Sequence, residues 1–305
     1  MGVGLFLLGI LSPFLEMIAP LMPGDIFPYF FSMELFQRAL LASVMVAIVA
    51  AILGTYLLVQ NLALLGDGLA HVSFGGVAVG IILGATSPLW YALLFSIVAA
   101  ILIHEMQSRE MLTGDASIAI FLTGMLALGL VLLRLFGGGI TTDIEGYLFG
   151  NMLLVDEDSL DLIAMICVLS IIVIGFLRNA LLAVAIDPVA ARIQGLPVRN
   201  IGLLFSITTA AVVVSMVQIV GTLLATALLV TPAATAQLIS RSFRQCLVWS
   251  QVFGLSSVFL GLYLSAELDT GSGAMIGLVA AVIFAVVAVS QILIRAFIKS
   301  GDNYN

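Results

Sequence analysis

Long runs of apolar residues, separated by short polar stretches, follow one another along the whole chain. A helix needs about 20 apolar residues to cross the hydrocarbon core of a bilayer. By that measure the sequence predicts membrane helices over residues 3–22, 36–59, 62–84, 88–107, 117–136, 158–178, 202–219, 221–240, 246–266 and 273–298. We therefore expect an all-α, polytopic membrane protein with nine to ten transmembrane helices.

The first 35 residues form a hydrophobic N-terminal extension with an interrupted pattern. Pro13, Glu16 and Pro20 break its apolar run. It also lacks the basic start and the small-residue cleavage site of a secretory signal peptide. We expect one extra membrane helix here, spanning or partly inserted. If it spans, the N-terminus lies in the cytoplasm.

The basic residues give the expected orientation of the chain, because Arg and Lys gather in cytoplasmic loops. They follow the fourth, sixth, eighth and tenth predicted helices, at Arg109, at Arg178, Arg192 and Arg199, at Arg241 and Arg244, and at Arg295 and Lys299. The short tail 299–305, and with it the C-terminus, is therefore predicted to be cytoplasmic.

The connections on the opposite side are acidic. They carry Asp143, Glu145, Asp156, Glu157, Asp158, Asp161, Glu267 and Asp269. A negative outer face raises the local concentration of cations. Hydrated loops of an acidic protein would show the same composition, so both interpretations stay open.

Composition narrows the class of protein further. Apolar residues make up 62% of the chain and charged residues 9%, with a mean hydropathy of +1.27. Such a surface needs a lipid bilayer as partner, and no polar block is long enough for a soluble domain. The net charge of −7 argues against a nucleic-acid partner.

The single lysine, Lys299, follows Ile298 and not the glycine of a phosphate-binding loop. The chain is therefore not a P-loop ATPase. We expect a transport subunit that is not itself an enzyme, holds no permanently bound cofactor, and draws energy from a partner chain or an ion gradient.

Two polar side chains interrupt the third apolar segment. Asp67 and His71 lie four residues apart, which places both on one face of a helix. A charged group within the bilayer costs about 2.5–3.5 kcal/mol even on the insertion scale, so it calls for a function. A carboxylate and an imidazole suit a divalent metal ion such as zinc, manganese or iron. A hydrogen bond that staples the helix, or a proton relay, would use the same pair. The other histidine, His104, lies near a predicted helix end beside Glu105 and Arg109, which favours a solvated residue over a ligand.

A cytoplasmic loop carries the start and stop signals of a short helix. Asp187 can cap the helix, Pro188 fits its first turn, and Gly195 and Pro197 end it. The segment is either an ordinary connector or a handle for another protein.

A proline interrupts the eighth apolar segment. Pro232 removes one backbone hydrogen bond and predicts a kink. The carbonyl groups freed there, together with Thr231 and Thr235, would line a transport path.

Five sequence motifs, in order, resemble the permeases of zinc- and manganese-uptake ABC transporters, the ABC-3 type of metal permease. They are Gly-Asp-Gly-Leu-Ala-His at 66–71, Asp-Ala-Ser-Ile-Ala-Ile at 115–120, Tyr-Leu-Phe-Gly-Asn at 147–151, the loop 187–197, and Thr-Pro-Ala-Ala-Thr-Ala at 231–236. The resemblance covers about residues 36–298, the expected permease domain. The chain departs from the family pattern at Ala70, at Gly75-Gly76 and at Gln60-Asn61.

The resemblance implies a fold like that of vitamin B12 and siderophore importers, and a set of partners. Two permease copies would form the path, two cytoplasmic ATP-binding subunits would drive it, and an extracytoplasmic metal-binding protein would deliver the ion. Asp67 and His71 would bind the metal. The ATPase-coupling residues would be Asp187, Pro188, Ala190, Ala191, Arg192 and Gly195.

The predicted function is the permease of an ATP-driven importer of divalent transition-metal ions, with zinc ahead of manganese or iron. A permease for a metal chelate, haem or a vitamin is one alternative. An ion-coupled secondary transporter that works without an ATPase is the other.

Overall fold

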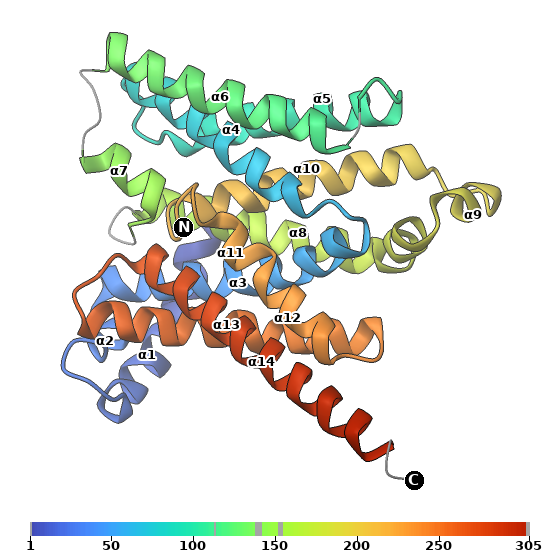
Figure 1. Ribbon diagram of the computed structural model, residues 1–305. Coiled ribbons are helices and arrows are strands. Elements are labelled where there is room, and N and C mark those ends of the chain that lie inside the picture. The colour runs from blue at the N-terminus through green and yellow to red at the C-terminus, as the bar shows by residue number, and fades with distance from the viewer. Residues whose placement is uncertain (1, 113, 138–141, 152–154, 303–305) are drawn as a thin grey trace.

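The computed structural model describes residues 2–112, 114–137, 142–151 and 155–302, with the side chains of 142–143 and 297–302 excepted. This part of the chain forms helices and no strands (Figure 1). The elements are α1 (Val3–Ile18), η1 (Ala19–Leu21), α2 (Tyr29–Ser32), α3 (Glu34–Val59), α4 (Ala63–Ile82), α5 (Leu89–Ser108), α6 (Gly114–Phe136), α7 (Thr142–Phe149), α8 (Glu157–Ile186), α9 (Pro188–Ile193), α10 (Val198–Val217), α11 (Ala225–Leu229), α12 (Thr231–Ile239), α13 (Phe243–Glu267) and α14 (Ser272–Asp302). The predicted all-α class is confirmed. The predicted cytoplasmic tail lies partly outside the described residues.

Nine helices in the described ranges are long and apolar enough to cross a membrane. They agree with nine of the ten predicted segments. The eighth segment, 221–240, is different: it consists of turns up to residue 224 followed by the short helices α11 and α12. The apolar pattern is continuous there, but the backbone is not, because residues 222 and 223 hydrogen-bond to another part of the chain.

That other part is α7 and the turn that follows it. The backbone N–H groups of Thr222 and Leu223 donate to the carbonyl oxygens of Tyr147 and Leu148, at 3.0 and 3.2 Å. Gly150 and Gly221 lie against each other with φ of +82° and +88°. Positive φ and the close approach of two backbones together require glycine at both positions. The Tyr-Leu-Phe-Gly motif thus fixes the point at which the broken helix begins.

The centre of the bundle is made by α3, α4 and α10, whose side chains are mostly buried. Helix α4 packs against α5, α6 and α10. At Gly76 an added Cβ would lie 2.7 Å from the Cα atom of Ala92, so α4 and α5 approach closely.

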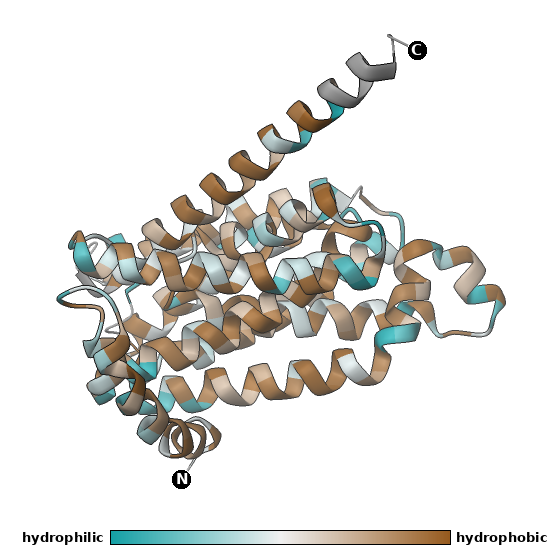
Figure 2. Cartoon of the chain, turned by 90° about the horizontal axis from the view of Figure 1, so that it is seen from below, coloured by the Kyte–Doolittle hydropathy of each residue, from teal (hydrophilic) through white to brown (hydrophobic). Residues whose placement is uncertain are grey.

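The outer helices α6, α8 and α14 expose large apolar side chains along their length (Figure 2). Examples are Leu135, Ile172 and Val286. Water does not solvate such faces, whereas lipid does. The polar residues gather toward the two ends of the bundle, which marks the membrane boundaries (Figure 2).

The acidic residues at one end of the bundle have structural partners. Asp156 caps α8 by accepting from the Ser159 N–H at 2.9 Å, and Glu157 pairs with Arg38 of α3 at 2.7 Å. Glu267, the last residue of α13, accepts three backbone hydrogen bonds from residues 25–27. Some of the acidic residues in these connections therefore have a structural role as helix caps or hydrogen-bond acceptors. The side chain of Asp143 lies outside the described residues.

Candidate metal path and coupling segment

Helix α4 carries the two polar side chains of the metal hypothesis on one face, in its second and third turns. The Nε2 atom of His71 lies 3.9 Å from the Oδ1 atom of Asp67. The side chain of His71 is 8% exposed and that of Asp67 28%. The predicted juxtaposition is confirmed. The distance exceeds the roughly 2.7–3.2 Å of a hydrogen bond, so in this structure the pair is not a hydrogen-bonded staple.

The other ring nitrogen of His71, Nδ1, is buried and lacks a hydrogen-bond partner among the residues that the structure describes. A buried polar atom left in this state costs about 1–3 kcal/mol unless something else engages it. Within the described ranges, no group of three or more His, Cys, Asp or Glu residues gathers around a common point, so the chain offers this pair and no closed cage.

The broken helix packs against α4 at Gly66, the residue before Asp67. An added Cβ at Gly66, next to Asp67, would come within 2.3 Å of the Leu229 side chain. On α3, a Cβ at Gly54 would lie 1.8 Å from the Leu229 carbonyl oxygen. Helix α11 ends at this leucine and α12 begins at Thr231. The helix is interrupted at Val230, two residues before Pro232, and the interruption is packed between α3 and α4.

The threonines of the break have local partners. Thr235 Oγ1 donates to the Thr231 carbonyl oxygen at 2.7 Å, and Thr235 is buried. Thr231 is half-buried and Pro232 is buried. The hydroxyl of Thr235 is thus hydrogen-bonded within its own helix. A role of these residues in lining a transport path stays a prediction.

The short helix predicted in the 187–197 loop is present as α9, which projects from the bundle (Figure 1). The Oδ1 atom of Asp187 accepts from the N–H groups of Val189 and Ala190, both at 2.9 Å. Gly195 ends the helix with φ +83°. Ala191 faces inward and is buried, whereas Pro188 and Arg192 are exposed and Ala190 is half-buried.

Sequence reasoning missed the most exposed apolar side chains of this segment. Ile186, Val189 and Ile193 are 69%, 67% and 82% exposed. Val189 and Ile193 are four residues apart and share one face of α9, and Ile186 is the last residue of α8. Their apolar character was visible in the sequence, but whether they point into the protein or away from it was not.

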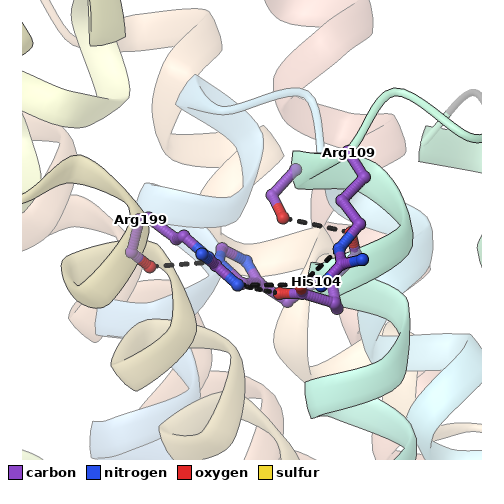
Figure 3. Close-up of polar contacts among 5 residues, drawn as sticks. His104, Arg109 and Arg199 are labelled. Carbon is purple, nitrogen blue, oxygen red and sulfur yellow. Dashed lines mark hydrogen bonds and ion pairs between the residues drawn. The ribbon is translucent and has the colours of Figure 1, made fainter.

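A polar clamp joins α5 to the start of α10, just after this segment (Figure 3). The Glu105 carboxylate accepts two hydrogen bonds from Arg199, both at 2.7 Å, and one from Arg109 at 2.6 Å. His104 Nε2 lies 3.0 Å from the Arg199 carbonyl oxygen. His104 is thus a half-buried contact between helices, not the freely solvated residue expected from the sequence.

A bundle of apolar helices, a half-buried acid beside a buried imidazole, and a projecting loop fit a multi-pass membrane permease. The model of the ABC 3 transport family matches residues 32–291. The chain belongs to this family. Its relatives are permease subunits of ABC transporters for manganese or zinc, and the prediction that the chain is a transport subunit and not an enzyme is confirmed.

Several characterised relatives are similar over most of their length. The manganese transport system membrane protein MntC of Listeria innocua is 33% identical over 248 residues, which is 81% of this chain and 88% of MntC. The high-affinity zinc uptake system membrane protein ZnuB of Haemophilus influenzae is 28% identical, covering 82% and 95% of the two chains.

Two solved structures share the fold. A chain of PsaBC from Streptococcus pneumoniae, in complex with Fab, matches with a TM-score of 0.73 and 31% identity, covering 83% of this chain and 90% of that one. An inward-facing ABC transporter of the metal-chelate type matches with a TM-score of 0.71 over 94% of this chain. At 18% identity the second likeness concerns the fold alone.

Proposed function

We propose that the chain is the membrane-spanning subunit of an ATP-driven importer for a divalent transition-metal ion, manganese or zinc. The observation that carries the proposal is the Asp67–His71 pair in the buried helix α4. Zinc lies about 2.0–2.2 Å from carboxylate oxygens and imidazole nitrogens, so two of its ligand atoms at a tetrahedral angle are about 3.4 Å apart. The two side chains are 3.9 Å apart, so a small rotation of either one would let a single ion bind both.

A pair of ligands suits transport better than storage. A structural zinc site closes around its ion with four protein ligands, and it releases the ion slowly. Two ligands from this chain leave the remaining positions to water or to other groups as the ion passes. Relatives named for manganese and for zinc both resemble the chain, and the ligand types serve both ions.

The projecting segment supports a partner-driven mechanism. Three large apolar side chains on α9 and next to it are 67–82% exposed in the described part of the chain, and an ATP-binding subunit would cover them. We propose that α9, capped by Asp187, fits such a subunit, with Pro188, Ala190, Ala191, Arg192 and Gly195 shaping the contact. This assignment places the segment and the C-terminus in the cytoplasm.

The remaining parts of the cycle follow from alternating access. Nucleotide binding would draw the ATP-binding subunits together, move α9, and shift α10 through its start at Val198. The clamp of Glu105 and Arg199 would pass that movement to α5. Two copies of the chain would form the path, and an extracytoplasmic metal-binding protein would load it. The broken helix packs beside α4. Its flexibility at Thr231, Pro232 and Thr235 would allow α4 to move with the bound metal.

Proteoliposomes of the whole complex test the assignment. Uptake of manganese or zinc should fall at least tenfold in Asp67→Ala and in His71→Ala. Ser73→Ala is the matched control, because Ser73 is buried in the same helix and bonds only within it, at 2.6 Å to the Ala70 carbonyl oxygen. Normal uptake by both variants would refute the metal site.

The same vesicles separate the rival functions. The proposal expects uptake of the bare ion that stops without ATP. Uptake driven by a gradient in the absence of ATP would identify a secondary transporter. Transport of a metal chelate or a vitamin, but not of the bare ion, would identify the alternative permease class.

A further inference from the structure

The N-terminal segment, residues 2–27, touches the bundle at three points. Near its start, the Leu5 N–H donates to Asp161 Oδ1 of α8 at 2.9 Å. In its middle, Ser12 Oγ donates to Gln37 Oε1 of α3 at 2.8 Å. At its end, the N–H groups of Asp25, Ile26 and Phe27 donate to Glu267 at 3.2, 2.9 and 2.9 Å.

All three points lie at the same end of the bundle. Asp161 is in the second turn of α8, Gln37 in the first turn of α3, and Glu267 is the last residue of α13. The ion pair of Arg38 with Glu157, at 2.7 Å, joins the second turn of α3 to the first residue of α8 directly. A spanning helix of this length would advance about 24 Å across the membrane. Helix α1 instead stays at one level.

The direction of α1 agrees with these contacts. In Figure 2 the bundle helices run across the view, whereas the helix next to the N-terminus is seen nearly end-on. Helix α1 therefore lies across the bundle axis and along the membrane plane. Its length and composition alone are those of a spanning helix, and the orientation appears only in the contacts.

One face of the segment 3–21 packs against the protein, and the opposite face is exposed in the part of the chain that the structure describes. Gly4, Leu8 and Ala19 are buried, and Leu15 packs against the core. The opposite stripe repeats every three or four residues and is 44–78% exposed: Val3, Phe6, Ile10, Phe14, Met17 and Leu21. No charged side chain lies in this stripe. The only acid of the helix, Glu16, is beside Ser12, near the polar contact with Gln37.

Aromatic residues mark the level at which α1 lies. Trp90 and Tyr91 line an open cavity of about 750 Å³ together with Val3 and Asp158. Trp90 and Tyr29 are about half exposed. Tryptophan and tyrosine beside acids are typical of the boundary between lipid tails and head groups. The acidic end of the bundle is also the end opposite α9.

We propose that residues 3–21 do not cross the bilayer but lie along its extracytoplasmic surface, with the exposed stripe in the outer leaflet and the N-terminus outside the cell. The occupant of the stripe is lipid. A helix that is apolar on the free side can bury that side at the boundary of tails and head groups. Asp161, Gln37 and Glu267 hold it there, so the segment forms a belt around the outer ends of α8, α3 and α13.

Cysteine labelling tests the topology in the whole complex. Gly9→Cys and Glu16→Cys, which lie outside the lipid-facing stripe and are exposed, are made separately with Cys167 and Cys246 replaced by alanine. Right-side-out vesicles are treated with a membrane-impermeant maleimide. Leu268→Cys, 61% exposed at the end of α13, is the extracytoplasmic control, and Met111→Cys, 65% exposed after α5, is the cytoplasmic control. We expect residues 9 and 16 both to label as residue 268 does. A spanning helix would place residue 9 inside the bilayer, so absence of labelling there in intact vesicles would overturn the proposal.

Depth-dependent quenching tests the occupant. Phe14→Trp is compared with Phe284→Trp, in the middle of α14, in vesicles that contain lipids brominated either near the head group or near the tail end. Lipids brominated near the head group should quench the fluorescence added at residue 14 at least twofold more than lipids brominated near the tail end. The fluorescence added at residue 284 should be quenched more by the lipids brominated near the tail end. Deep quenching at residue 14 would mean a spanning helix. Absence of quenching there would mean that protein, such as a second copy of the chain, covers the stripe. Either result would overturn the proposal.

Discussion

Truncation of Ile193 to alanine should weaken the binding of the ATP-binding subunit and leave the permease itself folded. The side chain is 82% exposed, so it contributes little to the fold of the isolated chain. In the proposed complex it is buried. The change removes three carbons, each worth about 0.8 kcal/mol when buried, which amounts to about 2 kcal/mol. At about 1.4 kcal/mol per factor of ten, the dissociation constant should rise about thirtyfold.

The measurement uses the permease in lipid nanodiscs and its purified ATP-binding subunit, with the affinity read by biolayer interferometry. Ile172→Ala is the matched control, because Ile172 is also an isoleucine, is 60% exposed, and lies in the lipid-facing middle of α8. The control should bind as the unchanged protein does. An affinity of Ile193→Ala within twofold of the unchanged protein would refute α9 as the docking segment, provided that thermal unfolding of the two is the same.

Three further changes test other parts of the account. Asp187→Ala removes the cap of α9 and should destabilise it by about 0.5–2 kcal/mol, seen as faster amide exchange, whereas Asp187→Asn should keep the protection; equal exchange in both would contradict the capping role. Gly54→Ala places a methyl group against the Leu229 carbonyl oxygen and should lower the melting temperature by an amount equivalent to about 1–3 kcal/mol, whereas Gly9→Ala, with open space around it, should not; similar melting of both would show that the contact at α3 is loose. Pro232→Ala restores a backbone donor and should slow uptake while leaving metal affinity unchanged; uptake at the normal rate would mean that the break is not needed for movement.

The apolar pattern predicted most membrane helices, because a run of about 20 apolar residues has few other stable states. It failed where backbone pairing with a distant segment decides the structure. Residues 218–224 lie where two predicted membrane segments meet, and they form turns because their backbone pairs with residues 147–151 through three hydrogen bonds. The path of residues 2–27 along the bundle end was hidden for the same reason, since three distant contacts determine it.

The candidate site was predictable where it depends on local spacing. Asp67 and His71 meet because they are four residues apart on one helix, and Asp187 caps α9 because both belong to one turn. The clamp between Glu105 and Arg199 joins residues 94 positions apart, and nothing in the local sequence predicts it. The outward direction of Ile193 likewise depends on how the whole loop leaves the bundle.

The account depends most on a metal ion held by His71, and X-ray absorption can observe that bond directly. The chain has two histidines, His71 and His104, so the permease purified without partners and without a histidine tag gives an interpretable spectrum. Loaded with zinc, it should show imidazole scattering at about 2.0–2.1 Å. That signal should vanish in His71→Ala and persist in His104→Asn. Imidazole scattering that persists in His71→Ala, or bound zinc with none in the unchanged protein, would contradict the proposed site.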